Sequence, residues 1–151
     1  MLIIKEGNIL QSTENIICHQ VNEYGIMGGG LALQIAKAYP EVEKQYKDFC
    51  NKLNGLLYGQ YQACKIGNKK YIANCFTQRN FVTNLEDIEL VFRGLLESCK
   101  LNNFTIAIPY GYGSNIAKGS WLQIQSLFEK LSNEYNVPII IYKLPNQKEL
   151  I

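Results

Sequence analysis

Two residues that could do chemistry stand three positions apart near the start of the chain. His19 is the only histidine in the 151 residues, and histidine is the side chain whose ordinary pKa suits proton transfer near neutral pH. Asn22 follows it and could orient a bound water. The pair predicts a weak acid–base site in which Asn22 holds the water and His19 assists. A histidine that only packs in the core is the alternative. Glu23 is a further candidate base, unless it is simply a solvated carboxylate.

A glycine-rich loop comes directly after these residues. The stretch 16–38 begins as a short apolar strand, passes through Gly25, Gly28, Gly29 and Gly30, and ends with helical spacing. A strand, a glycine loop and a helix in this order direct backbone N–H groups and a helix N-terminus at one spot, which favours an anion such as phosphate. Glycines allow a ligand to approach the backbone closely. The alternative is a flexible turn without a ligand.

A second loop of the same kind follows a second strand. The buried run Thr105–Pro109 leads into Tyr110–Gly119, which contains three glycines and is followed by another helical segment. Ligands of α/β proteins bind at the carboxyl ends of strands, where such loops meet. We therefore expect the two loops to clamp the two sides of a diphosphate. Tight turns that only connect elements are the alternative.

The elements that must position these loops alternate between strand and helix, with a hairpin in the middle. This order predicts an α/β fold, a three-layer α/β/α sandwich with a mixed central sheet. Asn84 is a predicted helix N-cap, and Gly55 a predicted C-cap. The expected strands are Leu2–Lys5, Asn15–Val21, Tyr58–Ile66, Lys70–Thr77, Phe104–Pro109 and Val137–Leu144. The expected helices follow the first glycine loop to about Tyr39 and then cover Glu41–Leu53, Leu85–Lys100 and Trp121–Asn133, with 145–151 as a short tail.

Composition limits the function classes. With 47% hydrophobic and 19% charged residues, the chain is expected to fold as one domain, residues 1–151. A net charge of +2 without a basic stripe argues against nucleic acid as the partner. No apolar run could span a bilayer, and the N-terminus lacks the pattern of a signal peptide. We expect a cytoplasmic protein without a membrane partner, and the sequence leaves its oligomeric state open.

The cysteines predict buried, reduced thiols. There are five of them, widely spaced and without a Cys-x-x-Cys pair. With a single histidine available, the sequence offers no zinc site, and we expect neither a metal nor a cofactor. Cys18 and Cys75 lie in strand-like runs near the loops, but no second histidine could serve as a base for a catalytic thiol.

Across nearly its whole length the chain resembles the macrodomain family. The matching motifs are Val21–Ala32 in the first loop and Ile108–Gly113 in the second. The resemblance is greatest to the branch that includes ADP-ribose 1''-phosphate phosphatases and TARG-type deacylases, and Gln34 and the pair 39–40 also point there. It implies the predicted sandwich fold and a cleft that binds ADP-ribose or a related nucleotide.

The resemblance also implies roles for individual positions. Asn8 stands where macrodomains usually carry an aspartate that accepts from the adenine amine, and its oxygen could accept the same bond more weakly. The backbone of Ile9 would lie near the adenine, Asn22 at the distal ribose, and the Tyr142 ring against the adenine. The residues implied to bind the ligand are Asn8, Ile9, Asn22, Gly28, Gly29, Gly30, Leu31, Gly111, Tyr112, Gly113, Ser114, Asn115, Ile116 and Tyr142.

The sequence departs from the family pattern at the catalytic positions. TARG-type enzymes use a lysine after the hairpin and an aspartate past the second loop. Here Gln78 and Ser120 stand near those positions. Glutamine cannot form the covalent sugar adduct of a lysine amine, and serine is a poor base. Lys118 is nearby and is expected to be solvated or to face a phosphate.

Three functions remain open at this point. The first is a binding module for ADP-ribose-type nucleotides. The second is a hydrolase, acting on ADP-ribose 1''-phosphate or on ADP-ribosyl adducts. The third, an RNA or polynucleotide binder, is disfavoured by the near-neutral charge.

Overall fold

A six-stranded sheet forms the centre of the computed structural model, which describes residues 1–150. The strand order is β1-β8-β7-β2-β4-β3. A separate two-stranded sheet pairs β5 with β6. The strands are β1 (Leu2–Glu6), β2 (Ile16–Gln20), β3 (Tyr61–Gly67), β4 (Lys70–Cys75), β5 (Gln78–Arg79), β6 (Val82–Thr83), β7 (Ile106–Pro109) and β8 (Ile139–Lys143).

The large sheet is mixed, as predicted. Strands β1, β8, β7, β2 and β4 are parallel to one another, whereas β3 pairs with β4 in antiparallel register. The predicted hairpin is therefore confirmed, with its turn at residues 68–69. Because five strands run in one direction, the loops that leave them open at the same edge of the sheet.

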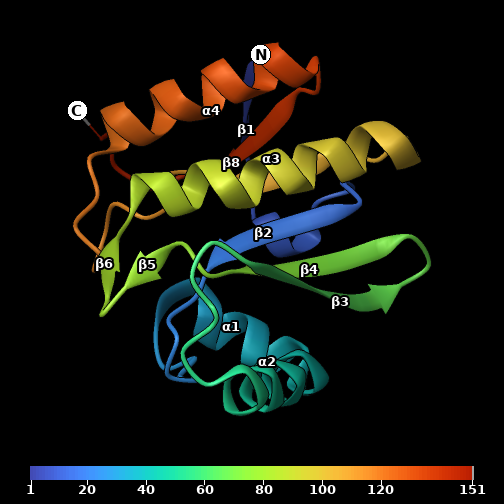
Figure 1. The fold of residues 1–151 in the computed structure, drawn as a ribbon. Helices are drawn as coiled ribbons and strands as arrows, with labels where there is room; N and C mark the ends of the chain where they lie inside the picture. Colours follow the sequence, from blue (N-terminus) through green and yellow to red (C-terminus); the bar gives the residue numbers. More distant parts are fainter. Residues whose placement is uncertain (151) are drawn as a thin grey trace.

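Helices cover both faces of the sheet and complete the three layers (Figure 1). Helices α3 and α4 lie on one face, and α1 and α2 lie on the other. A short 3₁₀ helix, η1, packs on the α1/α2 face through Ile9. The helices are η1 (Ile9–Gln11), α1 (Gly30–Ala38), α2 (Pro40–Leu53), α3 (Leu85–Asn102) and α4 (Trp121–Tyr135).

Alternation along the strands divides the core into two clusters. In β2, Ile16 and Cys18 pack toward α3 and α4, whereas Ile17 packs toward α1 and α2. Successive side chains of a strand point to opposite faces, so a parallel strand between two helical layers is apolar on both. His19 follows in this alternation and faces the α1/α2 side.

The helix ends were partly predictable. Asn84 caps α3, as predicted, and its side chain accepts a hydrogen bond from the N–H of Asp87 at 2.9 Å. Within α3 the buried residues form a stripe from Ile88 to Cys99. Leu85 has the spacing of this stripe but is 38% exposed, because it is the first residue of the helix and lacks a preceding turn to pack beside it.

Two local features differ from the sequence-based expectation. The β5–β6 hairpin was not predicted, because strands of two residues carry almost no periodicity. The segment 145–150 was expected to be only a tail, but it folds back on the second loop. The N–H of Leu150 donates to the Tyr110 hydroxyl at 2.8 Å, and that hydroxyl donates to Glu149 at 3.1 Å. Ile151, the last residue of the predicted tail, lies outside the described residues.

Within residues 1–150, no helix has both the length and the apolar composition that crossing a membrane would require.

Candidate functional site

A cavity of about 620 Å³ lies at the edge of the sheet where β2, β7 and β8 end. Both glycine loops line it, so the expected juxtaposition of the two loops is present. It also contains the two residues of the predicted acid–base pair and all but one of the predicted ligand-binding residues. Those that line it are Asn8, Ile9, His19, Asn22, Gly28, Gly29, Gly30, Leu31, Gly111, Tyr112, Gly113, Asn115, Ile116 and Tyr142. Their roles toward a ligand remain predictions.

The side chains of Ser114 and Tyr112 make their contacts within the protein. Ser114 does not line the cavity, because its hydroxyl turns back to the carbonyl oxygen of Gly111 at 2.7 Å. The Tyr112 side chain packs edge-on against Phe92 and Phe128 in the α3/α4 core and is 2% exposed. Tyr112 can therefore contribute backbone to the cavity but not its ring.

The Asn22 side chain holds the first loop in shape through hydrogen bonds. Its Oδ1 accepts from the N–H of Tyr24 at 2.9 Å, the N–H of Ile26 at 3.3 Å and the Tyr46 hydroxyl at 2.8 Å. Its Nδ2 donates to the carbonyl oxygen of Ile26 at 2.7 Å. One amide thus closes the turn that precedes the glycines and ties it to α2. Only the second Nδ2 hydrogen remains for a ligand hydroxyl or water.

The first loop ends in an uncapped helix. Gly29 is the N-cap of α1 in an extended conformation, no side chain caps the helix, and no acidic residue stands in its first turn. A Cβ at Gly29 would meet no atom within 4 Å. Gly30 has a φ of +56°, which a glycine adopts without strain. The orphan N–H groups of the first turn are left for an anion.

The second loop is shaped by contacts to its own backbone. Gly111 and Gly113 have φ of +78° and +73°. The carbonyl oxygen of Gly113 accepts from the Thr83 hydroxyl at 2.6 Å and from the N–H of Gly119 at 2.9 Å. A Cβ at Gly119 would lie 2.5 Å from that oxygen. Only glycine fits there, so this residue fixes the end of the loop.

His19 lies at the floor of the cavity as a neutral ring. It is 2% exposed, and its Nε2 is 2.6 Å from Oδ1 of Asn74 on the neighbouring strand. An amide oxygen only accepts, so Nε2 carries the proton and Nδ1 is an acceptor. Nδ1 is buried and has no partner among residues 1–150. Burial lowers the pKa of His19 to about 4, although the Asn74 bond opposes this.

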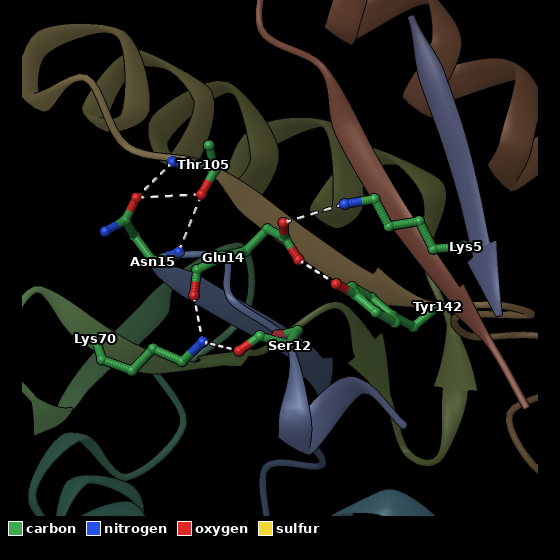
Figure 2. A network of polar contacts seen from close by, with 7 residues as sticks. All are labelled: Lys5, Ser12, Glu14, Asn15, Lys70, Thr105 and Tyr142. Carbon is green, nitrogen blue, oxygen red and sulfur yellow. Dashed lines mark hydrogen bonds and ion pairs between the residues drawn. The ribbon is translucent and has the colours of Figure 1, made fainter. Parts of the chain in front are cut away.

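One end of the cavity carries an aromatic wall held by a buried carboxylate (Figure 2). The Tyr142 hydroxyl donates to Oε1 of Glu14 at 2.6 Å, and Glu14 is 6% exposed. Lys5 lies 3.9 Å from the other oxygen of Glu14. Burial, followed by the contact with Glu14, raises the pKa of Tyr142 to about 12. Backbone carbonyls of Ser12 and Glu14 accept from Lys70, which fixes the segment that carries the carboxylate.

The opposite end is closed by the β5–β6 hairpin, which the sequence did not reveal. Phe81 lines the cavity and packs against Tyr24 with ring centroids 5.0 Å apart. Asn80 precedes it, and its N–H donates to Glu23 at 2.9 Å. The hydroxyl of Tyr58 donates to the same carboxylate at 2.6 Å. Glu23, a candidate base from sequence, instead joins the first loop to the hairpin and does not line the cavity.

Asn80 is the one weak signal of this hairpin in the sequence. In the structure, Asn80 and Phe81 both have positive φ, at +50° and +65°. Asparagine tolerates this conformation and favours turns, but nothing in the sequence indicates that Phe81 points at the loops. Ile26, Gln20, Leu144 and Gln147 also line the cavity without having been predicted.

The positions that depart from the family pattern lie in different places in the structure. Gln78 lines the cavity, whereas Ser120 is the N-cap of α4 and accepts from the N–H of Gln123 at 3.4 Å. Lys118 is absent from the cavity wall. Among residues 1–150 no Asp, Glu, Lys or Arg lines the cavity, so a ligand bound there would meet neither a carboxylate nor a permanent cation.

The thiols and the acidic residues of the described chain form no further site. All five cysteines are free and buried. Burial raises the pKa of the Cys18 thiol well above its usual value, and Cys18 packs in the α3/α4 core. Residues 1–150 contain no cluster of three or more His, Cys, Asp or Glu side chains that could hold a metal ion.

Comparison with known proteins places this geometry in a known fold. No family model matches the chain. An ADP-ribose 1''-phosphate phosphatase from Saccharomyces cerevisiae (strain YJM789) is 42% identical over 57 residues, which are 36% of this chain and 32% of that protein. The match therefore spans about a third of that relative's length. A protein of the same name from Lodderomyces elongisporus is 26% identical over 83% of this chain and 86% of its own.

Solved structures match over almost the whole chain. The macrodomain of Mycobacterium tuberculosis DarG has a TM-score of 0.82 at 23% identity and covers 94% of this chain and 97% of its own. Thermosipho africanus DarTG in complex with ADP-ribose has a TM-score of 0.82 at 22% identity, covering 99% of this chain and 43% of that one. The resemblance seen in the sequence is thus confirmed for the fold.

Replacing Asn22 with alanine is expected to loosen the first loop. The change removes the acceptor of three hydrogen bonds and leaves backbone groups of the turn unpaired, so the free energy of unfolding should fall by about 2 to 3 kcal/mol. Urea denaturation measures this fall in the free energy of unfolding. Asn51→Ala, at an exposed position of α2, is the control and should change the free energy by less than about 0.5 kcal/mol. Equal effects of the two changes would contradict the role of Asn22.

The buried neutral His19 predicts a specific dependence of stability on pH. The pKa falls from 6.5 in the unfolded chain to about 4 in the fold, so between these values the unfolded chain takes up a proton that the folded chain refuses. This contribution is complete above pH 6.5 and is lost as the pH falls toward 4, by roughly 3 kcal/mol in total. Urea denaturation of wild type and His19→Gln over this range tests it. The variant should lose less stability on acidification, and parallel curves would refute the assignment.

Proposed function

We propose that this chain, which has the macrodomain fold, binds ADP-ribose or a close derivative in the cavity between its two glycine loops. The diphosphate would lie between the loops, with the base at the Tyr142 end and the distal ribose near Asn22 and Phe81.

The observation that carries the proposal is a set of backbone N–H groups around an uncharged cavity. The first turn of α1 opens there without a cap, and the positive end of its dipole favours an anion. Across from it, the N–H groups of Gly113, Asn115 and Ile116 donate to no atom of residues 1–150. No carboxylate of the described residues lines the cavity to repel a diphosphate.

Size and shape support a nucleotide of this length. A cavity of about 620 Å³ lies within the range of sites for drug-sized ligands. Aromatic residues at its two ends, Tyr142 and Phe81, offer apolar surface on either side of the polar middle. The likeness to a solved fold in complex with ADP-ribose and to a relative named as a phosphatase of ADP-ribose 1''-phosphate points to the same ligand class.

Hydrolysis of ADP-ribose 1''-phosphate, or of an ADP-ribosyl adduct, is the second candidate. One observation favours it, which is the unpartnered Nδ1 of His19 on the cavity floor. That nitrogen could accept a proton from a water that the free Nδ2 hydrogen of Asn22 orients. The low pKa of His19 makes it a weak base, and Gln78 supplies no nucleophile. We therefore rank binding first.

We further propose that the chain works as one domain, residues 1–151, in the cytoplasm and without a cofactor. Two core clusters on opposite faces of one sheet support a single folding unit. A net charge of +2 gives little attraction for the phosphates of nucleic acid.

Isothermal titration calorimetry with ADP-ribose should show saturable binding, which Gly29→Val should abolish. Gly29 has an extended backbone and open space around it, so valine fits the fold and places its methyl groups over the α1 N-terminus. Gly67→Val, on the exposed β3–β4 hairpin, is the matched control and should bind as wild type does. No wild-type binding up to millimolar ADP-ribose would refute the proposal, and unchanged affinity in Gly29→Val would exclude the first loop from the site.

The hydrolase candidate predicts phosphate release from ADP-ribose 1''-phosphate. Release should fall at least tenfold in His19→Ala, because the proton acceptor is lost, while calorimetry should still show ADP-ribose binding. Wild-type protein that binds ADP-ribose but releases no phosphate would remove the phosphatase candidate and leave the binding module.

A further inference from the structure

The chain after β8 turns back and covers the start of the second loop. The turn is closed at Leu144, whose carbonyl oxygen accepts from the N–H of Gln147 at 3.0 Å and whose N–H donates to the Gln147 side chain at 3.2 Å. Residues 147–150 then contact Tyr110, the first residue of the loop. We call residues 144–150 the strap. Leu144 and Gln147 also line the cavity, so the strap lies beside the proposed site.

The strap holds Tyr110 at its backbone and at its hydroxyl. The Gln147 side chain donates to the carbonyl oxygen of Tyr110 at 3.3 Å. The Tyr110 hydroxyl accepts from the N–H of Leu150 at 2.8 Å and donates to Glu149 at 3.1 Å. Lys143 of β8 forms an ion pair with Glu149, and its ammonium nitrogen lies 5.4 Å from the centre of the Tyr110 ring. Three residues of the strap thus fix one residue of the loop.

Leu150 also lies against the glycine that follows Tyr110. Gly111 has a φ of +78°, and a Cβ there would be 2.8 Å from Cδ1 of Leu150. The carbonyl oxygen of Gly111 accepts from the N–H and from the hydroxyl of Ser114, which closes the first turn of the loop. Leu150 is partly buried and packs against the α3/α4 core cluster. Its side chain therefore connects the core to the beginning of this turn.

Support at this point affects binding because glycines form both bends of the loop. Glycine loses more conformational freedom than any other residue when its backbone is fixed. A loop that is fixed before the ligand arrives does not lose that freedom on binding, and this raises affinity. The far bend is held already, since the carbonyl oxygen of Gly113 accepts from Thr83 and Gly119. The strap is the matching support at the near bend.

We propose that the strap is a positioning element for the second loop, and that Leu150 is the residue through which it sets the affinity of the cavity for its nucleotide. This inference rests on the proposed function, since it concerns the same ligand. Leu150 does not line the cavity. It acts through Tyr110 and Gly111, which do, and needs no contact with the ligand.

Calorimetry with ADP-ribose on Leu150→Ala tests this role. The variant should bind about tenfold more weakly than wild type, because the near bend is then free to move before the ligand binds. Leu150→Met keeps nearly the same side-chain volume and should bind within about twofold of wild type. Leu101→Ala, the same change at a leucine of α3 that is 77% exposed, is the matched control and should bind as wild type does.

Trp121 provides a readout that needs no ligand. It is the only tryptophan in the chain, and its ring centroid lies 5.1 Å from that of Tyr110. Trp121 is 4% exposed. In ligand-free Leu150→Ala, its emission should shift to longer wavelength and be quenched more readily by acrylamide, because Tyr110 is no longer held beside it. A leucine that only contributed to global stability would leave the emission of the folded protein unchanged.

A double variant tests whether Leu150 acts through Tyr110. Tyr110→Phe keeps the ring and removes the hydroxyl that contacts the strap. It should weaken ADP-ribose binding, and combining it with Leu150→Ala should cost no more than about tenfold in total, because both changes break the same connection.

Wild-type affinity in Leu150→Ala, unchanged Trp121 emission in that variant, or losses that multiply in the double variant would overturn the positioning role while leaving nucleotide binding in place. A wild type that binds no ADP-ribose would overturn the proposed function, and this inference with it.

Discussion

The proposed chemistry of this cavity depends on backbone N–H groups that have no partner among residues 1–150. No charged side chain of the described residues lines the cavity, so an anion there must be held by main-chain N–H groups and by the dipole of α1. Such groups act only if the chain is bent to direct them inward and is held in that shape. The contacts that fix the two loops are therefore as much a part of the site as the N–H groups themselves.

Each loop is held by a different part of the sandwich. The first is tied to α2 through the Asn22 amide and the Tyr46 hydroxyl. The second is tied to the β5–β6 hairpin, since Thr83 donates to the carbonyl oxygen of Gly113, and Gly119 closes it. Because parallel strands end at one edge of the sheet, two independently supported loops come to face each other across a cavity of ligand size.

The groups at the two ends of the cavity are the reason why we propose binding ahead of catalysis. At the end that Tyr142 lines, a buried carboxylate fixes the Tyr142 ring, and the Asn8 oxygen accepts from the N–H of Leu10. At the distal end the groups that could react are weak, since His19 is buried and neutral and Gln78 is an amide. The cavity thus offers little of the acid–base chemistry that hydrolysis requires.

What the sequence determined by itself is local. Glycine clusters after apolar strands, the cap at Asn84 and the alternation of strand and helix depend on near neighbours, and these predictions were confirmed. Where a side chain's partners are distant in the sequence, its orientation was determined only in the folded chain. Examples are the Tyr112 ring, which turned into the core, and Phe81, which closes the cavity from a hairpin too short to show periodicity. The Asn8 side chain is a further example, since its oxygen accepts from the N–H of Leu10 in the η1 turn.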